Sequence, residues 1–199
     1  MASFTDYPPE APSRVALELR RHDVGGKLRR LAAHRYAGAA AVAVPLVALA
    51  YLRFGASGRF AVAAFLIPVL CVLAAIDLAE RRLPNRIVLP ATAIVLTAQI
   101  ALSPDRALEW TLAALGGALV LLLPLIVLRS GVGMGDVKLM LLLGAALGAA
   151  VVTGFLVASL AAGAYAAVLL ARGGSDARGT AFAFGPFLVF GALVALFLQ

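Results

Sequence analysis

The chain has 199 residues, of which 63% are hydrophobic and only 14% charged, and its mean hydropathy is +1.00. This composition excludes an ordinary soluble domain and predicts a polytopic membrane protein. The formal net charge of +7 could suggest nucleic acid, but in a membrane protein positive charge is better explained as a determinant of topology, so no nucleic-acid partner is expected. The single cysteine, Cys71, allows neither an internal disulfide nor a Cys-rich zinc site and is interpreted as a packing residue.

The hydrophobic residues form continuous runs rather than alternating ones. We therefore expect an all-α bundle of about seven transmembrane helices and not a barrel. Apolar runs cover approximately residues 36–52, 60–78, 87–102, 108–128 and 180–198. A further run, 137–171, would be about 52 Å long as one helix, against a hydrocarbon core of about 30 Å. Two spans broken near Gly148 to Gly154 fit it better.

The lysines and arginines predict the orientation of these spans. With seven spans and the N-terminus inside, fourteen basic residues fall on the inner side, Arg81 and Arg82 among them, and three on the outer side. Because cytoplasmic loops carry an excess of Lys and Arg, we expect a cytoplasmic N-terminus. We interpret 1–35 as a basic cytoplasmic tail, 36–54 as an extra N-terminal transmembrane helix and 60–199 as a six-helix core.

An ionisable residue stands at the mouth of the long apolar run. Alternating glycines, including Gly133 and Gly135, lead directly into Asp136. Beyond Lys138 no charged residue follows until Arg172. An ionisable group at membrane depth is costly and therefore suggests a function. The structural alternative is a glycine-rich turn in which Asp136 is a helix N-cap.

A second aspartate, Asp77, lies near the end of the run 60–78, on the same predicted cytoplasmic side as Asp136. Two close carboxylates share a proton, so one can activate water while the other polarises a peptide carbonyl. The predicted spans contain no histidine and the chain has no His-Glu-x-x-His motif, so serine and zinc protease chemistry are not expected. The structural alternative for Asp77 is an ion pair with Arg81 or Arg82.

Three elements of the sequence together resemble the type IV prepilin peptidases, which are GxGD intramembrane aspartyl proteases. Gly133-Met134-Gly135-Asp136 matches the GxGD signature, and Val137-Lys138-Leu139 continues it as in that family. Asp77 followed by Arg81-Arg82-Leu83-Pro84-Asn85 resembles the first catalytic aspartate and its basic loop. Phe184-Gly185-Pro186-Phe187-Leu188 is similar to the C-terminal Pro-Phe-Gly-Pro-Phe-Leu element, with Ala183 at the position of its first proline.

The resemblance implies an aspartic endopeptidase with Asp77 and Asp136 as catalytic residues and with no metal or other cofactor. It implies removal of the basic leader from prepilins or prepilin-like proteins at the cytoplasmic face of a bacterial or archaeal cytoplasmic membrane. The expected partners are these substrates and membrane lipid. The loops are too short for the cysteine-bearing domain that methylates the product in larger members, so the chain resembles the minimal, peptidase-only form of Flp/Tad-type pili.

Five further residues are expected to bind substrate or shape the loops of the site. Gly133 and Gly135 are expected to let a substrate backbone approach the GxGD aspartate, either by leaving space or by adopting positive φ. Gly185 and Pro186 are expected to break a helix near the two aspartates, although proline is also tolerated in an ordinary first turn. Lys138 is interpreted as an interfacial anchor, with attraction for an acidic residue early in the mature pilin as the alternative.

Other functions remain as alternatives. The two aspartates could form the relay of a proton-coupled transporter, although we find neither an internal repeat nor aspartates at mid-membrane positions. The presenilin-like branch of GxGD proteases has a Pro-Ala-Leu element that is missing here. A third alternative is an inactive membrane scaffold, which the presence of both aspartates in their motifs makes the less favoured interpretation.

Overall fold

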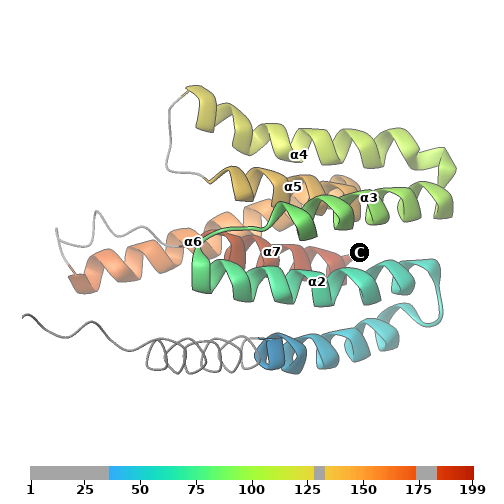
Figure 1. Cartoon of the computed structure of the whole chain (residues 1–199), viewed down its shortest axis with the longest axis horizontal. Helices are drawn as coiled ribbons and strands as arrows, with labels where there is room; N and C mark the ends of the chain where they lie inside the picture. Colours follow the sequence, from blue (N-terminus) through green and yellow to red (C-terminus); the bar gives the residue numbers. More distant parts are fainter. Residues whose placement is uncertain (1–35, 128–132, 174–182) are drawn as a thin grey trace, which may run out of the picture.

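The computed structural model describes residues 36–127, 133–173 and 183–199, and every regular element within these ranges is a helix. The elements are α2 (Gly58–Glu80), α3 (Asn85–Leu102), the 3-10 turn η1 (Pro104–Arg106), α4 (Ala107–Val127), α5 (Met134–Leu147), the 3-10 turn η2 (Gly148–Ala150), α6 (Val151–Gly173) and α7 (Gly185–Leu198). A further helical segment, Tyr36–Phe54, precedes them. The expected basic tail 1–35 lies outside the described residues. Successive helices run in opposite directions through the bundle (Figure 1).

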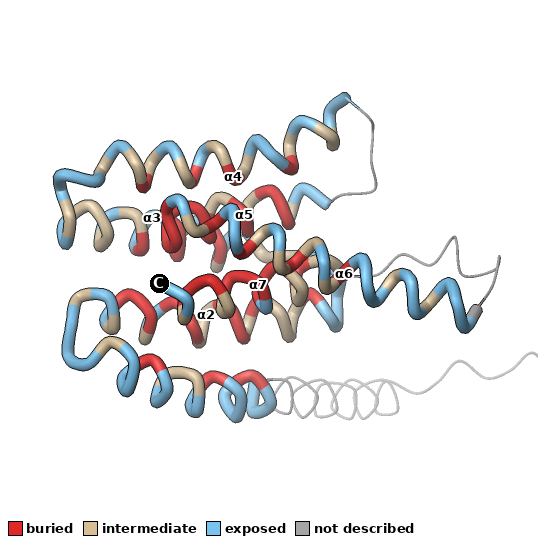
Figure 2. Tube along the Cα trace, turned by 180° about the vertical axis from the view of Figure 1, so that it is seen from behind, coloured by how far each residue is buried: buried red, intermediate tan, exposed pale blue. Residues whose placement is uncertain are grey.

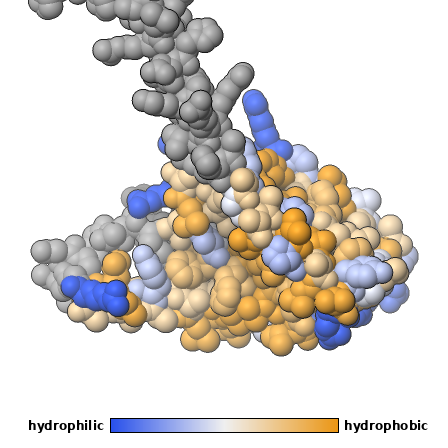
Figure 3. Space-filling model, turned by 90° about the horizontal axis from the view of Figure 1, so that it is seen from below, coloured by the Kyte–Doolittle hydropathy of each residue, from blue (hydrophilic) through white to orange (hydrophobic). Residues whose placement is uncertain are grey.

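Five helical segments are long and apolar enough to cross a membrane: Tyr36–Phe54, Gly58–Glu80, Asn85–Leu102, Pro104–Val127 and Met134–Arg172. The apolar helix Gly185–Leu198 is shorter. Many large hydrophobic side chains point outward, and hydrophobic residues cover most of the flank seen in Figure 3. Such a surface suits contact with lipid chains, because they are as apolar as the side chains that meet them. The chain is an all-helical membrane protein with about seven helices, as its sequence predicts.

The segment Met134–Arg172 is two helices and not one. α5 ends at Leu147, and α6 begins at Val151 after a 3-10 turn. Gly148, in that turn, has φ +57°, a conformation that favours glycine. A Cβ atom at this position would lie 2.7 Å from the ring of Trp110, so close packing also requires glycine. Figure 1 shows α6 running back along the bundle, which confirms the predicted break.

α5 is the central helix of the bundle. Ten of its fourteen residues are buried, whereas the flanking helices bury only one face (Figure 2). It packs most extensively against α4 and also contacts α3 and α7. Gly144 lets α4 approach closely, because a Cβ there would strike the backbone of Ala113. Small residues at such crossings are typical of helices that associate in membranes. The residue Asp136, in the first turn of α5, is thereby held at one end of the bundle.

Candidate active site

Three segments that lie far apart in the sequence meet at one end of the bundle. There α2 ends, α3 begins, and the first turns of α5 and α7 lie beside them (Figure 1). Together they form a cavity of about 340 Å³. It is lined by Asp77, Arg81, Arg82, Leu83, Asn85, Gly133, Met134, Gly135, Asp136, Lys138 and Phe184. Both predicted catalytic aspartates and part of each quoted motif therefore face the same space.

Asp77 lies in the last turn of α2 and is only 5% exposed. Its Oδ2 atom accepts a hydrogen bond from the backbone N–H of Gly185, at 3.1 Å, which joins α2 to the start of α7. Its backbone carbonyl accepts the N–H of Arg81, at 2.8 Å, in the C-cap of the helix. Among the described residues no ion pair joins Asp77 to Arg81 or Arg82, so the structural alternative for this carboxylate is wrong.

Arg81 closes α2 in an unusual backbone conformation. Its φ is 50° and its ψ is 36°, which is the left-handed region that non-glycine residues rarely adopt. A left-handed residue ends a helix by turning its N–H back onto the last turn, here onto Asp77. The sharp turn directs the chain from Asp77 into Arg82 and Leu83, which also line the cavity.

Asp136 is the third residue of α5 and is 9% exposed. The N-cap of the helix is Gly133, with φ −77° and ψ 143°, so the alternative of Asp136 as N-cap is wrong. The backbone N–H of Asp136 donates to the Gly133 carbonyl at 3.0 Å. A carboxylate in a first turn is stabilised by the positive end of the helix dipole.

The two glycines before Asp136 have different surroundings. A Cβ at Gly133 would lie 3.7 Å from Oδ2 of Asp136, at ordinary contact distance. A Cβ at Gly135 would lie 3.1 Å from the Cβ of Leu83, so the space there is already filled by the loop between α2 and α3. Neither glycine has positive φ, which corrects that part of the expectation. Gly135 allows two parts of the protein to meet.

Gly185 and Pro186 begin α7. Gly185 is buried, and a Cβ there would lie 2.5 Å from Oδ2 of Asp77. Pro186 occupies the first turn of the helix, as the ordinary role of a helix-start proline predicts, and it does not line the cavity. Phe184, the residue before Gly185, lines it instead.

Lys138 has a specific partner within the site. Its Nζ atom donates a hydrogen bond to Oδ1 of Asn85, at 2.8 Å, and links α5 to the start of α3. Both residues line the cavity. The sequence suggests that Lys138 anchors the helix at the membrane interface, and the structure shows in addition a hydrogen bond to a side chain of the site.

Four lining residues had no site role in the sequence interpretation: Leu83, Asn85, Met134 and Phe184. Each lies inside one of the three quoted motifs, and that membership was the available signal. Arg81 and Arg82, interpreted only as topology determinants or ion-pair partners, also line the cavity. All six of these residues lie close to Asp77, Asp136 or Gly185 in the sequence.

Comparison with protein families gives one match. The model of the type IV leader peptidase family matches residues 64–168, more than half of the chain. The chain belongs to this family. The matched range contains both Asp77 and Asp136. No curated protein and no solved structure matches the chain.

Membership in a leader peptidase family makes this membrane protein a protease and does not favour the transporter alternative. The arrangement at the end of the bundle is compatible with such chemistry. Two buried carboxylates from different helices face one cavity, and basic side chains stand on its rim. Within the described ranges no group of three or more His, Cys, Asp or Glu residues could hold a metal ion.

Proposed function

We propose that this leader peptidase is an intramembrane aspartic endopeptidase in which Asp77 and Asp136 form the catalytic pair. One observation carries the proposal: the two aspartates are both buried, come from α2 and α5, and line the same cavity. Carboxylates are rarely buried at membrane depth without a function. Two of them at one site can hold a single proton between them, which is the state that peptide hydrolysis requires.

The reaction needs only these two side chains and water. The ionised aspartate takes a proton from water, which attacks the carbonyl carbon of the scissile bond. The protonated aspartate hydrogen-bonds the carbonyl oxygen and stabilises the negative charge that develops on it. A proton then passes to the amide nitrogen, the C–N bond breaks, and the pair is ready to share a proton again. The Gly185 N–H fixes one oxygen of Asp77, which supports a defined carboxylate orientation.

The proposed substrates are type IV prepilins or prepilin-like proteins, cut between their basic leader and their hydrophobic helix. The cavity lies at the end of the bundle, where a substrate helix parallel to the bundle would also end. The described basic residues are more numerous at this end, namely Arg81, Arg82, Arg86, Lys138 and Arg172, than at the other, namely Arg53, Arg59 and Arg106. The excess supports a cytoplasmic active site, with the membrane a bacterial or archaeal cytoplasmic membrane.

We further propose the division of the chain into a tail (1–35), an added helix (36–54) and a six-helix protease core (60–199). The family match begins at residue 64, after the segment Tyr36–Phe54. The described part of that segment is the least buried of the five long spans, with 17% of its most apolar stretch inside the bundle. Both observations support its place outside the core.

The test is co-expression with a candidate prepilin, in which leader removal is seen as a faster-migrating band. Asp77→Asn and Asp136→Asn should each abolish cleavage, because the amide cannot exchange the proton. Asp105→Asn is the matched control, since Asp105 is exposed in η1 at the opposite end of the bundle. Substantial processing by either catalytic variant at normal accumulation would refute the assignment.

A further inference from the structure

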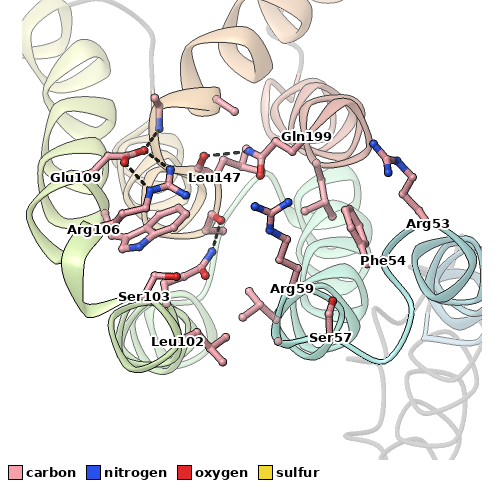
Figure 4. A pocket seen from close by; sticks show the side chains of 18 residues that line it. Arg53, Phe54, Ser57, Arg59, Leu102, Ser103, Arg106, Glu109, Leu147 and Gln199 are labelled. Carbon is pink, nitrogen blue, oxygen red and sulfur yellow. Dashed lines mark hydrogen bonds and ion pairs between the residues drawn. The ribbon is translucent and has the colours of Figure 1, made fainter.

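A second and larger cavity lies at the opposite end of the bundle from the aspartates. Its volume is about 740 Å³, and it is formed where the segment Tyr36–Phe54 meets α2, where α3 ends, where α4 begins, and where α5 and α7 end. Figure 4 shows it from close by. Nothing in the proposed peptidase chemistry uses this space, so its lining has to be explained separately.

The lining has an excess of positive charge. It contains three arginines and one acidic side chain, Glu109. Arg106 makes two hydrogen bonds to Glu109, at 2.8 and 2.7 Å, and so uses that carboxylate. Arg53 and Arg59 have no carboxylate partner among the described residues. Two arginine side chains of the lining are therefore left without an ion-pair partner among the described residues.

Arg59 holds the more central place of the two. It is the second residue of α2, and Figure 4 shows it reaching from that helix toward Gln199 and Leu147, while Arg53 lies at the edge beside Phe54. The first turn of α2 has no acidic residue. A cation at the N-terminus of a helix is unfavourable, because that end already carries partial positive charge. A bound anion would offset both the unpaired charge of Arg59 and the partial positive charge at the start of α2.

Some of the polar groups that line the cavity are already paired. Two acceptors on its wall are already used: the Gln99 amide donates to the Ala146 carbonyl at 2.7 Å, and the Gln199 amide donates to the Leu147 carbonyl at 3.0 Å. Trp110 lines the cavity, is only 5% exposed, and its buried Nε1–H has no hydrogen-bond partner. The free donors that reach the cavity are the guanidinium groups of Arg53 and Arg59, which fit a ligand with several acceptor oxygens, and arginine suits phosphate particularly well.

An apolar groove begins beside this cavity. It has a volume of about 410 Å³ and runs between α2 and α3, with Phe65, Ile94 and Ala101 in its lining. Val62 and Leu102 line both the groove and the charged cavity. A free phosphate would use only the cavity. A molecule with a phosphate head and a hydrocarbon chain would use both, which favours a phospholipid.

We propose that this end of the bundle binds one anionic phospholipid. Its phosphate pairs with Arg59 and Arg53, and one acyl chain lies in the groove between α2 and α3. Such a lipid would join α2, α3 and the segment Tyr36–Phe54 at the end remote from the aspartates. The proposal does not depend on which side of the membrane this end faces.

The test uses Trp110, the single tryptophan of the chain, as a reporter. The full chain is purified in a nonionic detergent and titrated with phosphatidylglycerol carrying brominated acyl chains, which quench tryptophan fluorescence on close approach. Trp110 is buried from bulk lipid but lines the cavity, so a lipid bound there brings its brominated chain closer to the indole ring and should quench it more strongly than bulk lipid does. We expect saturable quenching by brominated phosphatidylglycerol at a mole fraction about tenfold lower than for brominated phosphatidylcholine. Both lipids carry a phosphate, but the trimethylammonium group of phosphatidylcholine offsets its charge and is repelled by the two arginines. Equal quenching by the two lipids would overturn the proposal without any variant.

Matched variants locate the site. Arg59→Gln should weaken the quenching by phosphatidylglycerol about tenfold, whereas Arg172→Gln, exposed at the end of α6, should leave it unchanged. Ala101→Phe should fill the groove and weaken the quenching, whereas Ala167→Phe, on an exposed face of α6, should not. Folding of each is checked by gel filtration and circular dichroism. If inorganic phosphate or glycerol phosphate at millimolar concentration displaced the lipid completely, or if Ala101→Phe had no effect, the ligand would be a free anion and the lipid proposal would be wrong.

Discussion

The bare Cα of Gly185 lies against the carboxylate of Asp77. The Gly185 N–H donates to Oδ2 at 3.1 Å, and a Cβ at the same residue would come within 2.5 Å of that oxygen and 3.0 Å of the carboxyl carbon. Gly185 thus donates a hydrogen bond to Asp77 and, because it has no side chain, leaves room for the carboxylate of Asp77. The start of α7 therefore sets the position of an aspartate that belongs to α2.

Gly185→Ala should reduce cleavage by about 100-fold or more at normal protein accumulation. The added methyl must displace the carboxylate, and a misplacement of about 1 Å can have that effect on a reaction rate. The measurement is the initial rate of leader removal in detergent, normalised to the amount of folded protein. Gly163→Ala is the control, because no atom lies within 4 Å of a Cβ added in that part of α6. A wild-type rate for Gly185→Ala would show that the position of Asp77 is not decisive.

Gly135→Ala should slow cleavage through the loop between α2 and α3. The new methyl would lie 3.1 Å from the Cβ of Leu83, so the loop must shift by a few tenths of an ångström. Leu83→Gly in the same chain should restore part of the rate, because it removes the Cβ atom, and the side-chain atoms beyond it, with which the new methyl competes. Gly133→Ala should be milder, since its Cβ makes an ordinary 3.7 Å contact. A double variant slower than Gly135→Ala alone would show that Gly135 acts directly on substrate.

Lys138→Met and Asn85→Ala should lower the rate by similar factors, and the double variant should be no slower than either one. This follows if the 2.8 Å hydrogen bond between the two side chains holds α3 against α5 beside the cavity, because breaking it from either side has the same result. The alternative is attraction of Lys138 for an acidic residue of the substrate. In that case Lys138→Met should raise KM while Asn85→Ala leaves it unchanged, and the two effects would be independent.

Gly148→Ala should act on the fold and not on the chemistry. The residue has φ +57° and ψ −135°, a backbone region sparsely populated by non-glycine residues that costs them about 1–3 kcal/mol, and the crowding against Trp110 adds about 1–3 kcal/mol. We expect a lower Tm in detergent and lower accumulation, with activity per folded molecule close to normal. Gly163→Ala again serves as the control. Normal thermal stability together with a lost activity would contradict this assignment, because Gly148 lies at the end of the bundle remote from the aspartates.

The sequence alone was sufficient for the fold class, the family and the division of the long run 137–171. Membrane helices can be predicted in this way because each span must be continuously apolar over the thickness of the bilayer, and a run too long for one span must break. Gly148 could be assigned near the break because glycine is the residue that tolerates the required turn. The local motifs also identified Asp77 and Asp136 as residues that should meet, although nothing in a one-dimensional pattern fixes how they do so.

The contacts around the two aspartates were decided by the tertiary structure. That Gly185 donates to Asp77, that Leu83 fills the space beside Gly135, and that Lys138 pairs with Asn85 all depend on how α2, α3, α5 and α7 are placed relative to one another. The sequence predicts each helix from its own residues, since a helix satisfies its backbone hydrogen bonds internally. Helix packing depends instead on small residues and shapes matched between segments far apart in the chain, which local periodicity does not contain. For the same reason the cavity around Arg59, formed by the ends of six helical segments, could be recognised only once those ends were brought together.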